Sequence, residues 1–222
     1  MPETDSAPPT AASGGSPPGM APRILLALII GQVGLHAIMA GLRMAAPLQV
    51  LREGYSAFSV GMLFALFAAA PVLTAMAAGR ITDRHGYHRP VTISIALSLG
   101  GTLLAVVSTY LDGTPHFVLL CLAAMAVGTG ANTGMIAIQR TAGVTARDGT
   151  ERMRVFSWLG VAPSFSNVVG PVSVGLMIDF AGFRAAYLLM AVLIALPIWA
   201  AIQVPRTRAS PGRVLPATEG MP

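Results

Sequence analysis

The stretch Gly79–Arg89, with the sequence GRITDRHGYHR, is the densest group of charged residues in a chain that carries few charges. Long apolar runs flank it on both sides, which is typical of a short hairpin that joins two membrane-spanning helices. Gly86 permits the left-handed backbone conformation that such a turn needs. Gly79 leaves room for a neighbouring helix to approach closely. Asp83 is an acid among arginines, and we expect it either to pair with them or to face the positive end of a helix.

The composition of the chain is that of a membrane protein. It is 54% hydrophobic and 10% charged, with a mean hydropathy of +0.69, which excludes an ordinary soluble domain. The net charge of +5 comes from arginines at the ends of apolar runs rather than on one soluble face, so we expect no nucleic-acid partner. Cys121 lies inside an apolar run and, as the one cysteine, cannot form an internal disulfide.

Six apolar runs are long enough to cross a hydrocarbon core of about 30 Å, which takes roughly 20 helical residues. They cover approximately Ile24–Ala46, Ala57–Ala78, Val91–Leu111, Phe117–Ile138, Val155–Ile178 and Ala185–Ile202. The sequence therefore predicts one six-helix transmembrane domain over residues 23–202. Residues 1–22 and 203–222 are rich in Pro, Ala, Gly and polar residues, which predicts disordered cytoplasmic tails. The alternative for residues 203–222 is a linker to a second half of the protein.

The arginines are divided unequally between the two sides of such a chain. The side with both termini and the second–third and fourth–fifth connections holds eleven: Arg23, Arg80, Arg84, Arg89, Arg140, Arg147, Arg152, Arg154, Arg206, Arg208 and Arg213. The other side holds three, which are Arg43, Arg52 and Arg184. Because positive residues are enriched in cytoplasmic loops, both termini are predicted to be cytoplasmic.

A spaced repeat suggests internal symmetry. Four residues of the hairpin recur 96 positions later, Gly79, Asp83, Gly86 and Tyr87 as Gly175, Asp179, Gly182 and Phe183. Three predicted spans separate the copies, so the copies fall on opposite membrane faces. Such inverted three-helix repeats occur within transporter domains, with coincidence as the alternative explanation.

The hairpin also resembles the loop signature between the second and third transmembrane helices of the major facilitator superfamily. Gly79, Asp83, Arg84 and Gly86 match it, and the basic residue that follows is displaced to Arg89. The resemblance implies an all-α membrane protein with six transmembrane helices as two inverted three-helix repeats, one half of the family's fold. It also implies that these five residues form a cytoplasmic gate motif, whose acid docks on a helix of the other half. The alternative is a solvated hairpin that only fixes topology.

Polar residues in the first span are the main candidates for a transport cavity. Gln32, His36, Met39 and Arg43 are spaced by four, three and four residues, so they share one helix face. An ionisable group at membrane depth is costly and usually faces a cavity or a partner. The resemblance adds that the first and fourth spans line the transport path. The alternatives are a packing role for His36 and an arginine that extends to the membrane surface for Arg43.

The fourth and fifth spans supply the other candidates, Asn132 and Asn167. Gly128, Gly130 and Ala131 look like the small-residue part of the family's fourth-span motif, and they favour close helix packing. The arginine and glutamine of that motif are absent.

The pair Gly170-Pro171 predicts a helix bend near the path. It resembles the fifth-span motif of drug–proton antiporters. Ser173 and Val174 stand where that motif continues with paired glycines.

The resemblance implies a secondary active transporter in the cell (inner) membrane that moves a small solute, with protons as the coupling ion, by alternating access. It implies no cofactor and no metal. The chain supplies one six-helix half, so we expect a second half or a copy of itself, without which Gln32 and His36 would face lipid. A non-transporting membrane assembly or regulatory partner is an alternative. A membrane-embedded enzyme is another, but HExxH, GxSxG and paired intramembrane acids are absent from the sequence.

Overall fold

The computed structural model describes residues 20–146 and 148–205, and these residues form a helical bundle without strands. The helices are α1 (Pro22–Arg52), α2 (Ala57–His85), α3 (His88–Ser108), α4 (Gly113–Thr145), α5 (Gly149–Leu193) and α6 (Ala195–Gln203). The predicted all-helical fold is confirmed. The predictions for residues 1–19 and 206–222, and the placement of Arg147, lie outside the described residues.

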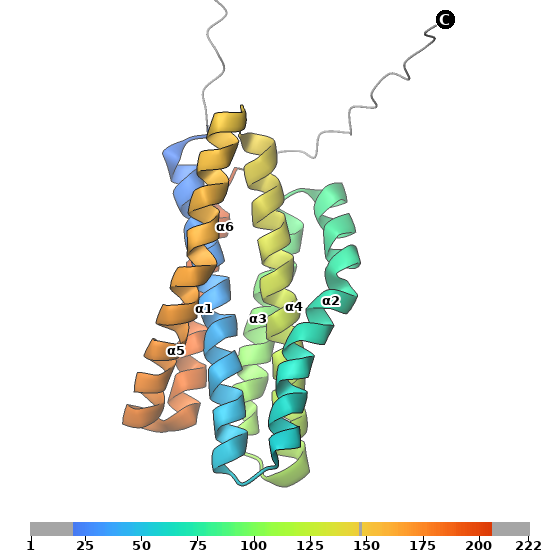
Figure 1. The fold of residues 1–222 in the computed structure, drawn as a ribbon, viewed down its shortest axis with the longest axis vertical. Coiled ribbons are helices and arrows are strands. Elements are labelled where there is room, and N and C mark those ends of the chain that lie inside the picture. The colour runs from blue at the N-terminus through green and yellow to red at the C-terminus, as the bar shows by residue number, and fades with distance from the viewer. Residues whose placement is uncertain (1–19, 147, 206–222) are drawn as a thin grey trace, which may run out of the picture.

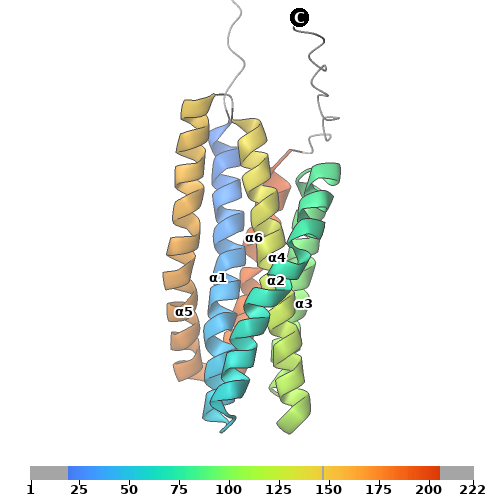
Figure 2. The same ribbon diagram turned by 45° about the vertical axis from the view of Figure 1, so that its right-hand side comes forward.

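α1 occupies the middle of the bundle, with α5 on one side and α4 on the other (Figures 1 and 2). Its most apolar segment is 61% buried, whereas that of α2 is only 17% buried. Most of its buried positions are small or apolar, which suits a helix that contacts neighbours all round.

α5 consists of two helical segments that meet at Gly182, where φ is 81° and ψ is 176°. The segment before Gly182 runs parallel to α1. The Ser166 hydroxyl donates to the carbonyl oxygen of Val33 at 3.1 Å, and farther along both helices Val174 packs against Gly41. At position 182 a residue other than glycine would be strained by the positive φ.

After Gly182 the chain returns antiparallel to α1, first in the second segment of α5 and then in α6 (Figure 1). Met190 lies beside Gly41 of α1, and Ala200 lies beside Gly31. The helix is interrupted at Ile194 because Pro197 has no N–H to donate to the carbonyl of Leu193.

The turns and caps follow from local chemistry. Gly86 ends α2 with a φ of 68°, and its N–H donates to the carbonyl oxygen of Thr82 at 3.0 Å, so the predicted left-handed turn is confirmed. The Asp148 carboxylate accepts from the backbone N–H of Glu151 at 2.7 Å, which caps the start of α5.

The helices extend beyond several of the predicted apolar runs. α4 begins at Gly113 and ends at Thr145, and α2 continues to His85. A helix continues into polar residues at its ends, whereas a hydropathy count stops with the last apolar residue. α3 ends earlier than its predicted run, at Ser108, because the chain turns at Thr109 and Tyr110.

Small residues bring α3 and α4 into close contact. The Ser94 hydroxyl donates to the carbonyl oxygen of Gly130 at 2.6 Å. A Cβ at Gly130 would lie 2.6 Å from the Ser98 Oγ, and one at Gly128 would lie 3.0 Å from the carbonyl oxygen of Phe67 on α2. The packing role predicted for the glycines of the fourth span is confirmed.

Five helical stretches of the described residues are long and apolar enough to cross a membrane. They are α1, α2, α3, α4 and the combined stretch Gly149–Gln203, which Gly182 divides. The chain is therefore a multi-pass membrane protein by length and composition.

Gly170→Ala should lower the thermal stability of the protein, because the new Cβ would lie 2.6 Å from the carbonyl oxygen of Ala37 on α1. Overpacking of this kind costs about 1–3 kcal/mol. Gly160→Ala is the matched control, since it lies on the same helix with nothing within 4 Å of the added atom. Thermal unfolding in detergent measures both, and equal unfolding temperatures would contradict a close α1–α5 contact.

Candidate functional site

A groove of about 490 Å³ opens between α1, α2 and α5, and it brings together residues that the sequence placed in different spans. Its lining consists of Ala40, Arg43, Met44, Phe64, Asn167 and Pro171. Two predicted cavity residues, Arg43 and Asn167, therefore share one surface with one residue of the predicted bend. All of them come from helices that also expose large apolar side chains.

Arg43 supplies the positive charge of the groove. Its side chain is exposed, and its guanidinium carbon lies 6.0 Å from the centre of the Phe64 ring. No carboxylate of the described residues forms an ion pair with it. A guanidinium only donates hydrogen bonds, whereas the amide of Asn167 both donates and accepts. The groove can therefore bind a solute with polar or anionic groups beside an aromatic or apolar body.

Gln32 and His36 lie outside this groove, at the contact between α1 and its neighbours. The Gln32 amide donates to the carbonyl oxygen of Leu159 on α5 at 3.1 Å, and the His36 Nδ1 lies 3.1 Å from the carbonyl oxygen of Gln32. Their exposed fractions are 1% and 7%. The expectation that a lone half leaves these two side chains facing lipid is wrong, because both are buried within this chain's own bundle. The Gln32 Oε1 has no hydrogen-bond partner among the described residues.

The remaining predicted residues are distributed over α4 and α5. Asn132 is half-buried on α4 and does not line the groove. Gly170 is buried against Ala37 of α1, and Pro171 lines the groove. Both keep helical backbone angles, and the non-helical angles of α5 occur at Gly182 instead. A bend at Gly170-Pro171 stays a prediction.

Asp83 of the predicted gate motif pairs with Arg140 of α4. The Arg140 Nε donates to the Asp83 Oδ1 at 2.8 Å, and one terminal nitrogen of Arg140 donates to the Asp83 backbone carbonyl at 3.4 Å. The Asp83 side chain is 72% exposed and that of Arg140 is 33% exposed, so the pair contributes only about 0–1 kcal/mol to stability. Its effect is to fix the end of α2 against α4.

The other motif residues are exposed or serve the turn. Arg84 and Arg89 are exposed, and neither forms an ion pair with the described residues. A Cβ at Gly79 would meet nothing within 4 Å, so the close helix neighbour expected there is absent from the described part of the chain. Tyr87 is 3% exposed between α2 and α3, and this burial raises the pKa of its hydroxyl.

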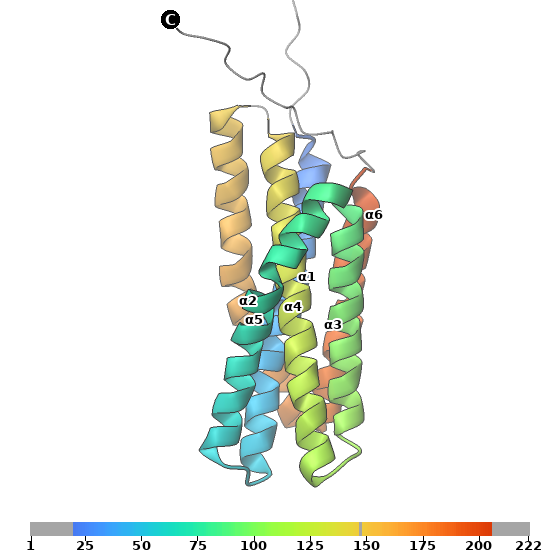
Figure 3. The same cartoon turned by 90° about the vertical axis from the view of Figure 1, so that its right-hand side faces the viewer.

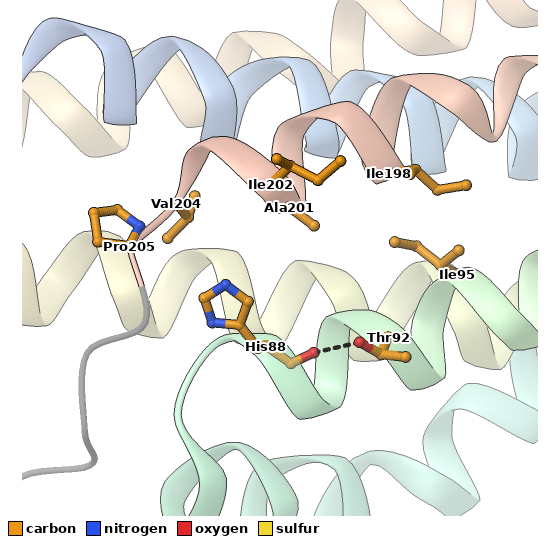
Figure 4. A pocket seen from close by; sticks show the side chains of 8 residues that line it. All are labelled: His88, Thr92, Ile95, Ile198, Ala201, Ile202, Val204 and Pro205. Atoms are coloured by element: carbon orange, nitrogen blue, oxygen red, sulfur yellow. Dashed lines mark hydrogen bonds between the residues drawn. The ribbon is translucent and has the colours of Figure 1, made fainter.

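A second hollow, of about 530 Å³, lies between α3 and α6 and contains none of the predicted site residues. Ile95 faces Ile198 across it, and His88 lies at the start of α3 (Figure 4). The Thr92 hydroxyl donates to the His88 carbonyl oxygen at 2.9 Å within the helix, so its hydrogen bond is already used. The remaining lining is apolar, which makes this hollow chemically distinct from the groove at Arg43.

Sequence reasoning missed two contributors to these sites, Phe64 and the partnership of Arg140 with Asp83. Phe64 gave no signal, because it is one apolar residue within an apolar run. Arg140 gave a weak one, since it falls on the same side of the predicted topology as Asp83.

Comparison with known proteins agrees with the loop motif. A sequence model described as the Major Facilitator Superfamily matches residues 28–220, which include α2 to α6 and most of α1. The chain is also similar to the tetracycline resistance protein, class C, of Escherichia coli, with 33% identity over 173 residues. The aligned region covers 76% of this chain and 41% of that protein, so the chain spans about two-fifths of the length of this relative. This chain belongs to the Major Facilitator Superfamily.

Proposed function

We propose that this chain is the N-terminal six-helix half of a secondary active transporter. The half moves a small solute by alternating access, coupled to protons, together with a second six-helix half or a second copy of itself. Family membership supports transport, and the coverage of 41% of the relative supports the assignment to one half. In such transporters the solute site lies near the bilayer midplane between repeated units.

The exposed polar groups of the groove are the observation that carries this proposal. An arginine facing hydrocarbon costs roughly 2.5–3.5 kcal/mol at a helix centre on insertion scales and less toward a helix end, and it usually faces a water-filled cavity instead. Arg43 and Asn167 are both exposed on apolar helices. A second half that covers α2 and the first segment of α5 would enclose the groove and keep these groups away from lipid.

Six membrane crossings in two inverted repeats are part of the proposal. Support comes from Gly86 and Gly182, which occupy equivalent positions in the two copies of the repeat. Both end a helical segment with a positive φ, at 68° and 81°. The two reversals lie at opposite ends of the bundle (Figures 1 and 3). The stretch after Gly182, which includes the second segment of α5 and α6, then forms the sixth crossing.

The gate assignment gains a specific role for Arg140. We assign Asp83 to a switching contact that the Arg140 pair holds in one state and that a helix of the second half competes for in the other. The small stability of an exposed ion pair suits a contact that must open during each cycle. Tetracycline is the first solute to test, because resistance to it names the relative.

Fusions of a topology reporter test the six crossings. A reporter after Thr145 or after Pro205 should read cytoplasmic, and one after Gly54 or after Ala181 should read external. If the stretch after Gly182 does not cross, the Ala181 and Pro205 fusions will give the same signal, and the model of two inverted repeats fails.

Asp83→Asn should reduce solute transport by the complete transporter while membrane insertion stays normal, because the neutral amide cannot hold the Arg140 ion pair. Asp148→Asn is the matched control, since asparagine also caps a helix and Asp148 forms no ion pair among the described residues. Uptake into proteoliposomes measures both variants. Equal losses would reduce Asp83 to a residue that only fixes topology.

The requirement for a second half is tested by reconstituting residues 1–222 with and without a second six-helix half. Without a second half the chain should self-associate, aggregate or be degraded, and no monomer of it should transport solute. A monodisperse monomer of this chain that moves solute in liposomes would refute the proposed function.

Arg43→Gln in the complete transporter should weaken solute binding about tenfold to a hundredfold, because a hydrogen bond to a charged group contributes roughly 1.5–3 kcal/mol. Arg52→Gln is the control, since Arg52 also lies on α1 over an aromatic ring, at 5.5 Å from Phe183, but outside the groove. Binding assays on both variants decide the matter: similar affinities would exclude the groove as the solute site.

A further inference from the structure

A buried histidine connects three helices at the end of the bundle remote from the described chain ends (Figure 3). His116 lies in the first turn of α4 and is 1% exposed. Its Nδ1 is 2.8 Å from the carbonyl oxygen of Ser108, the last residue of α3. Its Nε2 is 3.1 Å from the Oε2 of Glu53, which directly follows α1. Both ring nitrogens therefore face oxygen atoms.

The two contacts require a proton that a neutral imidazole does not have. The carbonyl of Ser108 only accepts, so the Nδ1 must carry a hydrogen. In the neutral ring the Nε2 would then present a lone pair to the Glu53 carboxylate. The Nε2 has an ion-pair distance to Glu53 but not the alignment of a hydrogen bond, and it has no other partner among the described residues. The attraction therefore depends on a positive charge on the ring.

Glu53 is held in place from its other side. Its Oε1 accepts from the Gln49 amide at 2.8 Å, and the Gln49 Oε1 accepts from the Tyr187 hydroxyl at 2.7 Å. Tyr187 and Gln49 are buried, at 0% and 5% exposure. The Tyr187 hydroxyl donates to the amide oxygen of Gln49, so the amide nitrogen of Gln49 points toward Glu53. This nitrogen only donates, so the Oε1 of Glu53 must accept. The pair with His116 thus belongs to a connected series of polar groups across α1, α3, α4 and α5.

Solvent reaches Glu53, the exposed member of this pair, through a hollow of about 570 Å³ lined by Glu53, Gly54, Tyr55, Asp112 and Gly113. Glu53 is 39% exposed there, so its carboxylate is in contact with water. Burial, and then the charges of Glu53 and Asp112, raise the pKa of Tyr55, so that this hydroxyl stays neutral and donates to the carbonyl oxygen of Gly113 at 2.7 Å.

The two arginines nearest this end, Arg184 and Arg52, contact other groups. Arg184 donates to the Thr109 hydroxyl at 3.1 Å and lies 3.8 Å from the Tyr110 ring centre. Arg52 lies over the ring of Phe183. The groups that face His116 are therefore Glu53 and the ring of Tyr55, whose centre is 6.4 Å away, with Asp112 as the further acid of the hollow.

We propose that His116 and Glu53 form a proton-binding site that joins the ends of α1, α3 and α4. A proton from water enters through the hollow and binds at the His116 Nε2, which gives an imidazolium–carboxylate pair. When the proton returns to water, the neutral ring keeps its bond to Ser108, but its contact with Glu53 becomes repulsive and the end of α1 loses this link to the start of α4. The proposal does not depend on transport or on a second half.

Solid-state NMR on proteoliposomes tests this site, because it does not depend on the oligomeric state. The protein carries ¹⁵N-labelled histidine and ¹³C-labelled serine carbonyls, so the His116 signal is recognised by the proximity of its Nδ1 to Ser108. Between pH 5 and pH 9 the Nε2 signal of His116 should change from that of a protonated nitrogen to that of an unprotonated one, while the Nδ1 signal stays that of a protonated nitrogen. A His116 signal that stays constant across this range, in either protonation state, overturns the proposal.

Glu53→Gln should move the midpoint of this titration to lower pH, since the opposite charge that favours the imidazolium is lost. The control signal is that of His85, which is exposed and whose Nδ1 lies only near the carbonyl oxygen of Ile81 in its own helix, at 3.2 Å. That signal should not respond to the substitution. An unchanged His116 midpoint in the variant would contradict the pairing with Glu53, and the wild-type titration still decides the proposal if the variant does not fold.

Discussion

The close approach of α1 to its neighbours is the contact on which the rest of this bundle depends. Lipid tails are as apolar as leucine, so helices in a membrane associate through packing and polar contacts rather than through the hydrophobic effect. A Cβ at Gly34 would lie 2.8 Å from Pro197 Cδ, and one at Gly41 would lie 2.8 Å from Val174 Cγ2. Both halves of the α5–α6 hairpin are therefore placed by small residues of α1, and the groove at Arg43 exists because α5 is held at this distance.

The hairpin at Gly86 and the helical character of the chain could be predicted because both are local. A left-handed turn needs glycine whatever surrounds it, and a long apolar run forms a helix in lipid because its backbone groups must bond internally. The packing of Gly130 was predictable for a similar reason, since a small residue within a span has few other uses.

The environment of each polar side chain could not be predicted from spacing. Gln32, His36 and Arg43 share a helical period, yet the first two are buried in the bundle and Arg43 is exposed. Which part of a helix face is covered depends on where the neighbouring helix crosses it, and that is a tertiary property. The Asp83–Arg140 and Glu53–His116 pairs were missed for the same reason, since each joins residues more than fifty positions apart.

The hydrogen bond from Gln32 to Leu159 has a consequence for biosynthesis. The ribosome makes α1 first, but the carbonyl that accepts from Gln32 is made 127 residues later. At 5–20 residues per second, the delay is on the order of ten seconds. During this interval the central helix of the bundle has its amide in the membrane or the translocation machinery without its final partner. Assembly of the bundle is therefore completed from its last helices back onto its first, and a substitution at Gln32 would act on nascent chains before it acts on the finished protein.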